Sequence, residues 1–286
     1  MEQVGIGGKC MNAISLDGKK VIFIGNSFVY YGNCVIYGSG ESDKGYFYQL
    51  ARSNGDDVMV INHTYGGRTL RYIYENCLPK DREYYKDVEC VFMSEAGQNN
   101  ASLTEDCKRI SNLLCENART FYLCHEYTYK ADHKTIKESF EPLRDMGFTI
   151  VNWGKLVYDI WNGNIAVPGA TMIYDRWSFI KNNKGFVNGY GAVGEGKSGD
   201  CHHQNPLSGY LTALMAYCAA TNRSAALQAY GFCSDASIHP FFDFEAFKRT
   251  HYNGITETNF DKIFSSQADM KGLMLLAEEY LNKYNS

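Results

Sequence analysis

The sequence predicts an α/β fold, a three-layer α/β/α sandwich built on a five-stranded parallel sheet. Short apolar runs rich in Val, Ile, Phe and Tyr recur along the first half of the chain, and stretches long enough to hold a helix separate them. The runs are continuous rather than alternating, which is typical of strands covered on both faces. The five expected strands are residues 21–24, 58–61, 88–93, 120–124 and 148–151.

Helices are expected where apolar residues recur at helical spacing. In the stretch 105–118, Ile110, Leu113 and Leu114 form one stripe, and Met270, Leu273 and similar residues do so near the end of the chain. A βαβ series has right-handed crossovers, and its ligand site lies outside the carboxyl ends of the strands. The expected helices are 46–53, 105–118, 134–146, 207–221 and 270–284.

The length of 286 residues fits one α/β domain with insertions. We expect an N-terminal extension at 1–19 and a single domain over 20–286. Within it, the glycine- and aromatic-rich stretch 155–199 is typical of an elaborated surface loop on the site side. Residues 223–286 are expected to add a helical extension.

Charge and composition exclude several classes of function. The formal net charge is -4 with no block of like charges, so neither nucleic acid nor a membrane surface is an expected partner. The first twenty residues lack the apolar centre of a signal peptide, so the chain as given is expected to be cytoplasmic, or secreted or periplasmic if a leader was removed. The ten cysteines include no CxxC pair, which favours reduced, buried thiols.

Four polar clusters carry the expected chemistry. Three follow the first three strands: Gly25-Asn26-Ser27, residues 62–69 and residues 94–100. The fourth, residues 200–203, precedes an expected helix. Ester cleavage by a serine needs a hydroxyl, an imidazole base, a carboxylate that orients the base, and N–H donors for the oxyanion. The four clusters supply all of these groups on one rim of the sheet.

The same four blocks, GNSF, NHTYGGRTL, GQNN and DCHH, resemble those of the SGNH (GDSL-like) hydrolase superfamily, in particular a largely uncharacterised bacterial branch. The resemblance spans residues 21–211 and implies a flavodoxin-like SGNH hydrolase fold. It implies Ser27 as nucleophile, His203 as base and Asp200 as its partner. Ser27, Gly67 and Asn99 would form the oxyanion hole, and no cofactor or metal would be required.

Several features depart from the family pattern, including the following two. Asn26 stands where the family commonly has Asp, and Gln204-Asn205 stand where it often has Pro-Ser. In the second block the oxyanion donor remains open between Gly66 and Gly67. In the third block it remains open between Asn99 and Asn100. Ser27 taken alone is also typical of a helix N-cap.

The sequence therefore predicts a serine esterase or acylhydrolase that works through an acyl-enzyme, with a short acyl group, acetyl above all, on a carbohydrate as substrate. Two alternatives from other classes remain. One is an inactive SGNH-fold protein that binds a glycan, and the other is a metal-dependent hydrolase that uses the Asp200–His203 cluster.

Overall fold

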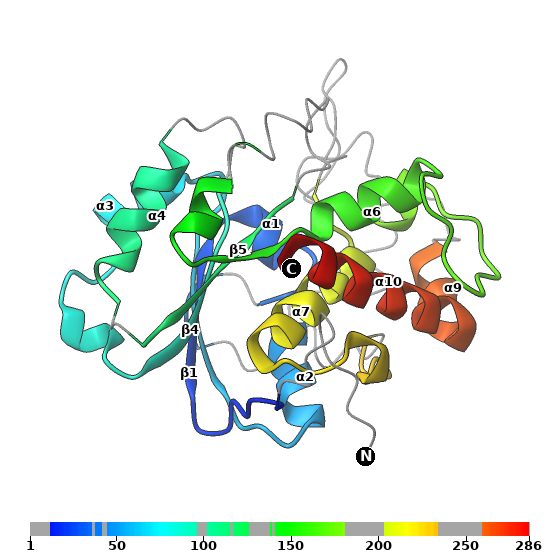
Figure 1. The fold of residues 1–286 in the computed structure, drawn as a ribbon, viewed down its shortest axis with the longest axis horizontal. Helices are drawn as coiled ribbons and strands as arrows, with labels where there is room; N and C mark the ends of the chain where they lie inside the picture. The colour runs from blue at the N-terminus through cyan, green and yellow to red at the C-terminus, as the bar shows by residue number, and fades with distance from the viewer. Residues whose placement is uncertain are drawn as a thin grey trace.

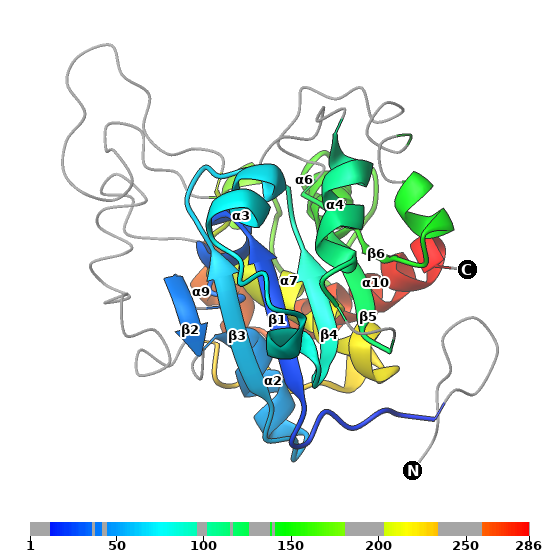
Figure 2. The same ribbon diagram turned by 90° about the vertical axis from the view of Figure 1, so that its left-hand side faces the viewer.

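The computed structural model is a three-layer α/β/α sandwich, and it describes residues 12–35, 38–41, 45–95, 102–114, 117–125, 138, 141–180, 203–233 and 259–285. Figures 1 and 2 show the central sheet with helices on both faces. The strand order is β2-β3-β1-β4-β5-β6. The strands are β1 (Lys20–Gly25), β2 (Gly38–Glu41), β3 (Met59–Thr64), β4 (Val88–Met93), β5 (Arg119–Leu123) and β6 (Thr149–Val151).

The five parallel strands of the sequence prediction are confirmed. Strands β3, β1, β4, β5 and β6 pair in parallel, each within a few residues of its expected bounds. A sixth strand, β2, pairs antiparallel with β3 at the edge of the sheet. Apolar patterning did not predict β2, because its sequence Gly-Ser-Gly-Glu contains no apolar side chain.

The apolar runs are continuous because both faces of the strands are buried, as β1 shows. Val21 and Phe23 belong to one buried cluster, whereas Ile22 and Ile24 belong to the other, so successive side chains enter opposite layers. On the first face, the ring of Phe92 in β4 stacks on Phe23 and on Phe121 of β5, each with 4.7 Å between centroids. The three neighbouring strands are thus tied together by an aromatic ladder.

The helices divide between the two faces of the sheet (Figure 1). The layer with Phe23 contains α2 (Tyr46–Ser53), α6 (Trp153–Trp161), α7 (Pro206–Thr221), α9 (Asn259–Ser265) and α10 (Gln267–Asn285). The opposite layer contains α3 (Leu70–Asn76), the short helix η2 (Arg82–Tyr85) and α4 (Leu103–Ser111). Other short helices in the described ranges include α1 (Ser27–Tyr30), η4 (Arg176–Ser178) and η5 (Ala225–Leu227).

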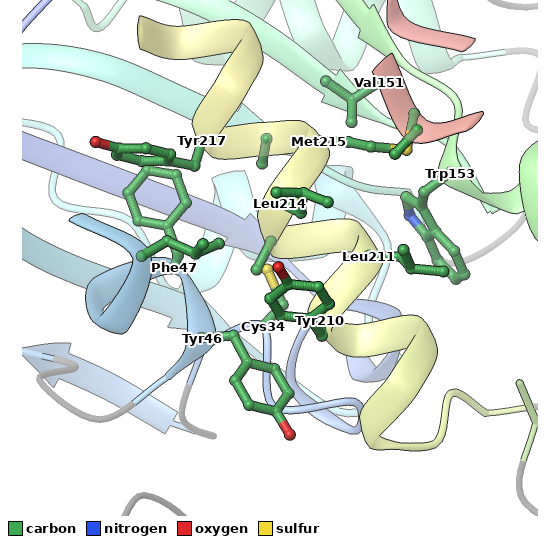
Figure 3. Packing of buried hydrophobic residues seen from close by; sticks show 14 of the residues in the cluster. Cys34, Tyr46, Phe47, Val151, Trp153, Tyr210, Leu211, Leu214, Met215 and Tyr217 are labelled. Carbon is green, nitrogen blue, oxygen red and sulfur yellow. The ribbon is translucent and has the colours of Figure 1, made fainter. Parts of the chain in front are cut away.

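Helix α7 is the centre of its layer. All of its residues except Ala219 are buried, so it is apolar around its whole circumference. Figure 3 shows its side chains against Phe47 of α2 on one side and against Trp153 and Val151 on the other. This packing fixes the helix that follows His203 firmly against the sheet.

The two edges of the sheet end differently. On one side β2 supplies a sixth strand. On the other, the Asn285 side chain pairs with the outer backbone of β6: its Oδ1 accepts a hydrogen bond from Ile150 N, and its Nδ2 donates one to Ile150 O, both at 2.9 Å. One side-chain amide therefore takes the place of a neighbouring strand.

Some sequence expectations need correction or fall outside the described ranges. The stretch 155–199 is not loop from its start, because α6 runs to Trp161 and η4 covers Arg176–Ser178; residues 181–199 lie outside the described part. The expected helix 134–146 is described only at 138 and 141–146. Within the expected helical extension 223–286, α10 packs on β6, α6 and α7 and so adds to one layer of the domain. Among the described helices, none is long and apolar enough to cross a membrane.

Candidate active site

Ser27 lies just after the carboxyl end of β1, a central strand, where the chain turns into α1. Asn26 is the N-cap residue of that helix, since its Oδ1 accepts a hydrogen bond from Phe28 N at 3.0 Å. Its Nδ2 donates to Ser94 O at the end of β4, at 3.1 Å. The capping role weighed for Ser27 is therefore filled by Asn26, and the Ser27 hydroxyl is available for other contacts.

Ser27 and His203, two of the predicted site residues, meet in the structure. The Ser27 Oγ lies 2.7 Å from the His203 Nε2, although 176 residues separate them in sequence. The two residues are 6% and 8% exposed. A serine hydroxyl at this distance can donate its proton to the imidazole, which is the geometry required of a nucleophile and its general base.

The segment that carries His203 is held in place by the residues that follow it. Asn205 caps α7, with its Oδ1 accepting from Leu207 N and Ser208 N. Its Nδ2 also donates to Ser178 O at 2.8 Å, and Ser208 Oγ donates to Phe179 O at 2.6 Å. Asn205 thus fixes the loop that presents the imidazole.

A backbone contact between two glycines joins the segment that carries Ser27 to the helix that follows His203. A Cβ on Gly209, in the first turn of α7, would lie only 1.6 Å from Gly32 O, and a Cβ on Gly32 would lie 2.5 Å from Gly209 Cα. The backbone just after α1 therefore rests directly on the backbone of α7. This contact sets the spacing between the element that carries Ser27 and the element that follows His203.

The turn after β3 holds the predicted oxyanion glycine. Tyr65 N donates to Gly25 O at 2.9 Å, and Arg68 N donates to Tyr65 O, which closes the turn beside the end of β1. Gly67 has a φ of 66°, a conformation that favours glycine. At Gly66 a Cβ would lie 2.9 Å from the Tyr30 hydroxyl, the mobile end of a side chain that can shift to make room, so only Gly67 has a backbone conformation that favours glycine.

Glu95 connects the second and third blocks. Its carboxylate accepts a hydrogen bond from Leu70 N, at the start of α3, at 3.2 Å, and its side chain is fully buried. A carboxylate is stabilised at a helix N-terminus by the free N–H groups and the helix dipole. Glu95 thereby anchors the helix that follows the Gly66–Gly67 turn, a role that the sequence pattern did not reveal.

Two aromatic rings, one from α1 and one from its C-cap residue Tyr31, lie against the His203 imidazole. The centroid of the Tyr31 ring lies 4.3 Å from that of His203, and the centroid of the Phe28 ring lies 5.1 Å from it. Phe28 stacks in turn on His125, with 4.0 Å between centroids and 12° between planes. His125, which no motif singles out, is a buried neighbour of the site.

Other polar residues considered near the site have structural partners. His63 is buried, and its Nε2 lies 3.0 Å from the Tyr84 hydroxyl; burial lowers its pKa. Arg68 is exposed and lies over the ring of Tyr72. Trp153 is fully buried in the layer around α7.

Asp200, Asn99, Asn100 and His202 lie outside the described residues, so their placement stays a prediction. The same holds for most of the Asp200–His203 cluster as a metal site. Within the ranges that the structure describes, no three His, Cys, Asp or Glu side chains gather in a way that would hold a metal ion.

Among the described residues, the following cysteines are free thiols: Cys34, Cys77, Cys90, Cys107 and Cys218. Burial raises the pKa of the Cys90 thiol to about 12, and it also raises the pKa values of Cys34, Cys107 and Cys218. These thiols therefore stay protonated near neutral pH and do not compete with Ser27 as nucleophiles.

No family model and no curated protein matches the sequence. Among solved structures, a DUF4886 family protein from Bacteroides uniformis ATCC 8492 is similar over 94% of this chain and 96% of its own, with 11% identity and a TM-score of 0.52. This likeness shows a shared fold over nearly the whole chain.

Two further solved structures are similar over about half of the chain. Axe2, an acetylxylan esterase from Geobacillus stearothermophilus, has 12% identity and a TM-score of 0.40, over 52% of this chain and 83% of its own. A GDSL-like lipase from Parabacteroides merdae ATCC 43184 has 11% identity and a TM-score of 0.38, over 51% and 83%.

Proposed function

We propose that this protein is a serine esterase or acylhydrolase that works through an acyl-enzyme. The observation that carries the proposal is the 2.7 Å contact between Ser27 Oγ and His203 Nε2 at the carboxyl end of β1. This rim of a parallel sheet is where α/β folds place their ligand sites. The order of the four blocks, and their resemblance to the SGNH hydrolases, support the same chemistry.

In the proposed reaction, His203 takes the proton of Ser27 while the serine oxygen attacks the ester carbonyl. The carbonyl oxygen becomes an oxyanion, which the N–H groups of Ser27 and Gly67 and the Asn99 side chain would bind. Because Ser27 is the first residue of α1, its N–H has no acceptor four residues back within the helix. Removing one such donor typically costs about 3 kcal/mol of transition-state stabilisation.

Collapse of the tetrahedral intermediate then releases the alcohol, which takes the proton from His203, and leaves an acyl group on Ser27. Water, activated by His203, attacks this acyl-enzyme and releases the carboxylic acid. Asp200 is proposed to hold the imidazole in the tautomer that accepts the serine proton. The chain needs no cofactor for these steps.

For the substrate, we propose a short acyl group, acetyl above all, on a carbohydrate. The near-complete burial of Ser27 favours a small acyl group over a long chain. The carbohydrate part rests on the SGNH-like resemblance and on the aromatic residues of the 155–199 stretch. Release of acetate from acetylated xylan would support this, and preference for long-chain esters or thioesters would contradict it.

The first test compares wild type with Ser27→Ala for hydrolysis of p-nitrophenyl acetate and for intact-mass labelling by a fluorophosphonate probe. Loss of the hydroxyl should abolish both the activity and the single adduct, because the probe bonds to the nucleophilic oxygen. Ser53→Ala is the matched control, since Ser53 is an exposed serine in α2 whose Oγ bonds Leu50 O. It should behave as wild type.

Three outcomes would contradict the proposal. Labelling that persists in Ser27→Ala would exclude Ser27 as the nucleophile. Activity that disappears in EDTA and returns with zinc would favour a metal-dependent hydrolase. A folded wild type with neither activity nor adduct would favour a protein that binds a glycan without cleaving it.

A further inference from the structure

Tyr31 contacts His203, the base of the proposed reaction, but has no role in the steps of that reaction. The two ring centroids are 4.3 Å apart and the planes are inclined by 35°. This distance is slightly shorter than the roughly 4.5–7 Å typical of aromatic pairs, so the two rings are in direct contact. Phe28 adds a second ring, 5.1 Å from His203 and inclined by 37°.

Helix α1 brings these groups to one place. Tyr31 follows Ser27 by four residues, and its N–H donates to Ser27 O at 3.1 Å, so hydroxyl and ring lie on the same side of one helical turn. The next residue, Gly32, rests on Gly209 of α7. The ring of Tyr31 is therefore held against the segment that carries His203.

An aromatic face in this position acts on the base in two ways. It restricts rotation of the imidazole, which must keep its Nε2 directed at Ser27 Oγ. It also stabilises the imidazolium that forms when the base takes the serine proton, because the negative face of an aromatic ring attracts a cation. Both effects act on the transition state more than on substrate binding.

We propose that Tyr31 is a positioning residue for His203, with its ring rather than its hydroxyl as the active part. This inference rests on the proposed esterase function, since it concerns the base of that reaction. In this role Tyr31 acts through the imidazole that its ring contacts.

The test compares Tyr31→Leu, Tyr31→Met and Tyr31→Phe with wild type. The first two variants keep apolar volume but remove the ring, so kcat for p-nitrophenyl acetate should fall by about 10-fold, within the range of about 2- to 30-fold that one cation–ring contact gives. KM should stay within about two-fold. The fluorophosphonate labelling rate of Ser27 should fall in parallel with kcat, and Tyr31→Phe should restore most of both, because it keeps the ring.

Tyr48→Leu is the matched control. Tyr48 is a half-buried tyrosine of α2 whose hydroxyl reaches Asp57, next to the amino end of β3 and so at the rim opposite Ser27. Its kcat and labelling rate should match those of wild type. Thermal unfolding of each variant shows whether a loss of activity merely reflects a loss of folded protein.

Two results would overturn the inference in distinguishable ways. If wild type hydrolyses the ester and labels at Ser27, but folded Tyr31→Leu or Tyr31→Met keeps wild-type kcat, or Tyr31→Phe is as slow as they are, the ring has no positioning role. If wild type neither hydrolyses nor labels, the esterase function fails and the role of Tyr31 fails with it.

Discussion

The glycine contact beneath the site can be tested by Gly209→Ala. The new Cβ would lie 1.6 Å from Gly32 O, 2.1 Å from Gly32 C and 2.4 Å from Gly32 Cα. All three atoms belong to the backbone, so no side chain can rotate away. To restore even 3.0 Å between Cβ and the oxygen, α7 and the end of α1 must separate by about 1.4 Å.

That separation acts directly on the reacting pair, because Ser27 precedes Gly32 and His203 precedes Gly209 by a few residues each. A 2.7 Å hydrogen bond does not survive a displacement of this size. A misplacement of 1 Å typically costs about 100-fold in rate, so kcat/KM should fall by at least that factor. Overpacking should also reduce the free energy of unfolding by about 1–3 kcal/mol, partly offset by the better helix propensity of alanine.

The assay is p-nitrophenyl acetate hydrolysis beside urea unfolding, with Gly231→Ala as matched control. Gly231 has open space where its Cβ would stand, so its replacement should change neither quantity. Wild-type activity and stability in Gly209→Ala would refute the argument that this backbone contact sets the geometry of the site.

Two further substitutions probe the support of the site and of its layer. Asn26→Ala removes the cap of α1 and the bond to Ser94 O, and should lower the free energy of unfolding by about 1 kcal/mol, measured by urea unfolding; an unchanged midpoint would contradict the capping role. Burial opposes ionisation of Asp269, but hydrogen bonds from Ser266, Thr171 and other donors lower its pKa to about 2. Because this pKa lies below the ordinary 3.8, the stability that Asp269 contributes is present above about pH 4 and is lost as the pH falls towards 2. Asp269→Asn should therefore lower the Tm at pH 7 and have less effect at pH 2.5, whereas an equal loss at both pH values would contradict the hydrogen-bonded carboxylate.

The parallel strands could be predicted from the sequence because both faces of the sheet are covered. In β4, for example, every residue except Glu89 is buried, so the run from Val88 to Met93 has the same bounds in sequence and structure. Strand β2 could not be predicted, since it joins the sheet through its backbone and has no apolar residue to mark it.

Only part of the candidate site could be predicted from the sequence. Ser27 and His203 stand in motifs, and the structure brings them together. The supports around them depend on contacts between distant parts of the chain, which leave no periodic pattern. The Gly32–Gly209 contact is such a case, and so is the bond from Asn26 to Ser94 O. The caps formed by Asn26 and Asn205 had a local signal, because Asn is common immediately before a helix.

The pairing of Asn285 with β6 has a consequence for association between copies of the chain. An uncovered edge strand offers its backbone as a template for a strand of another molecule, which leads to aggregation. Here β2 occupies one edge, and a single carboxamide close to the end of α10 occupies the other. Fraying of the last turn of the last helix would therefore uncover the backbone of Ile150 and open this edge of the sheet to pairing with another strand.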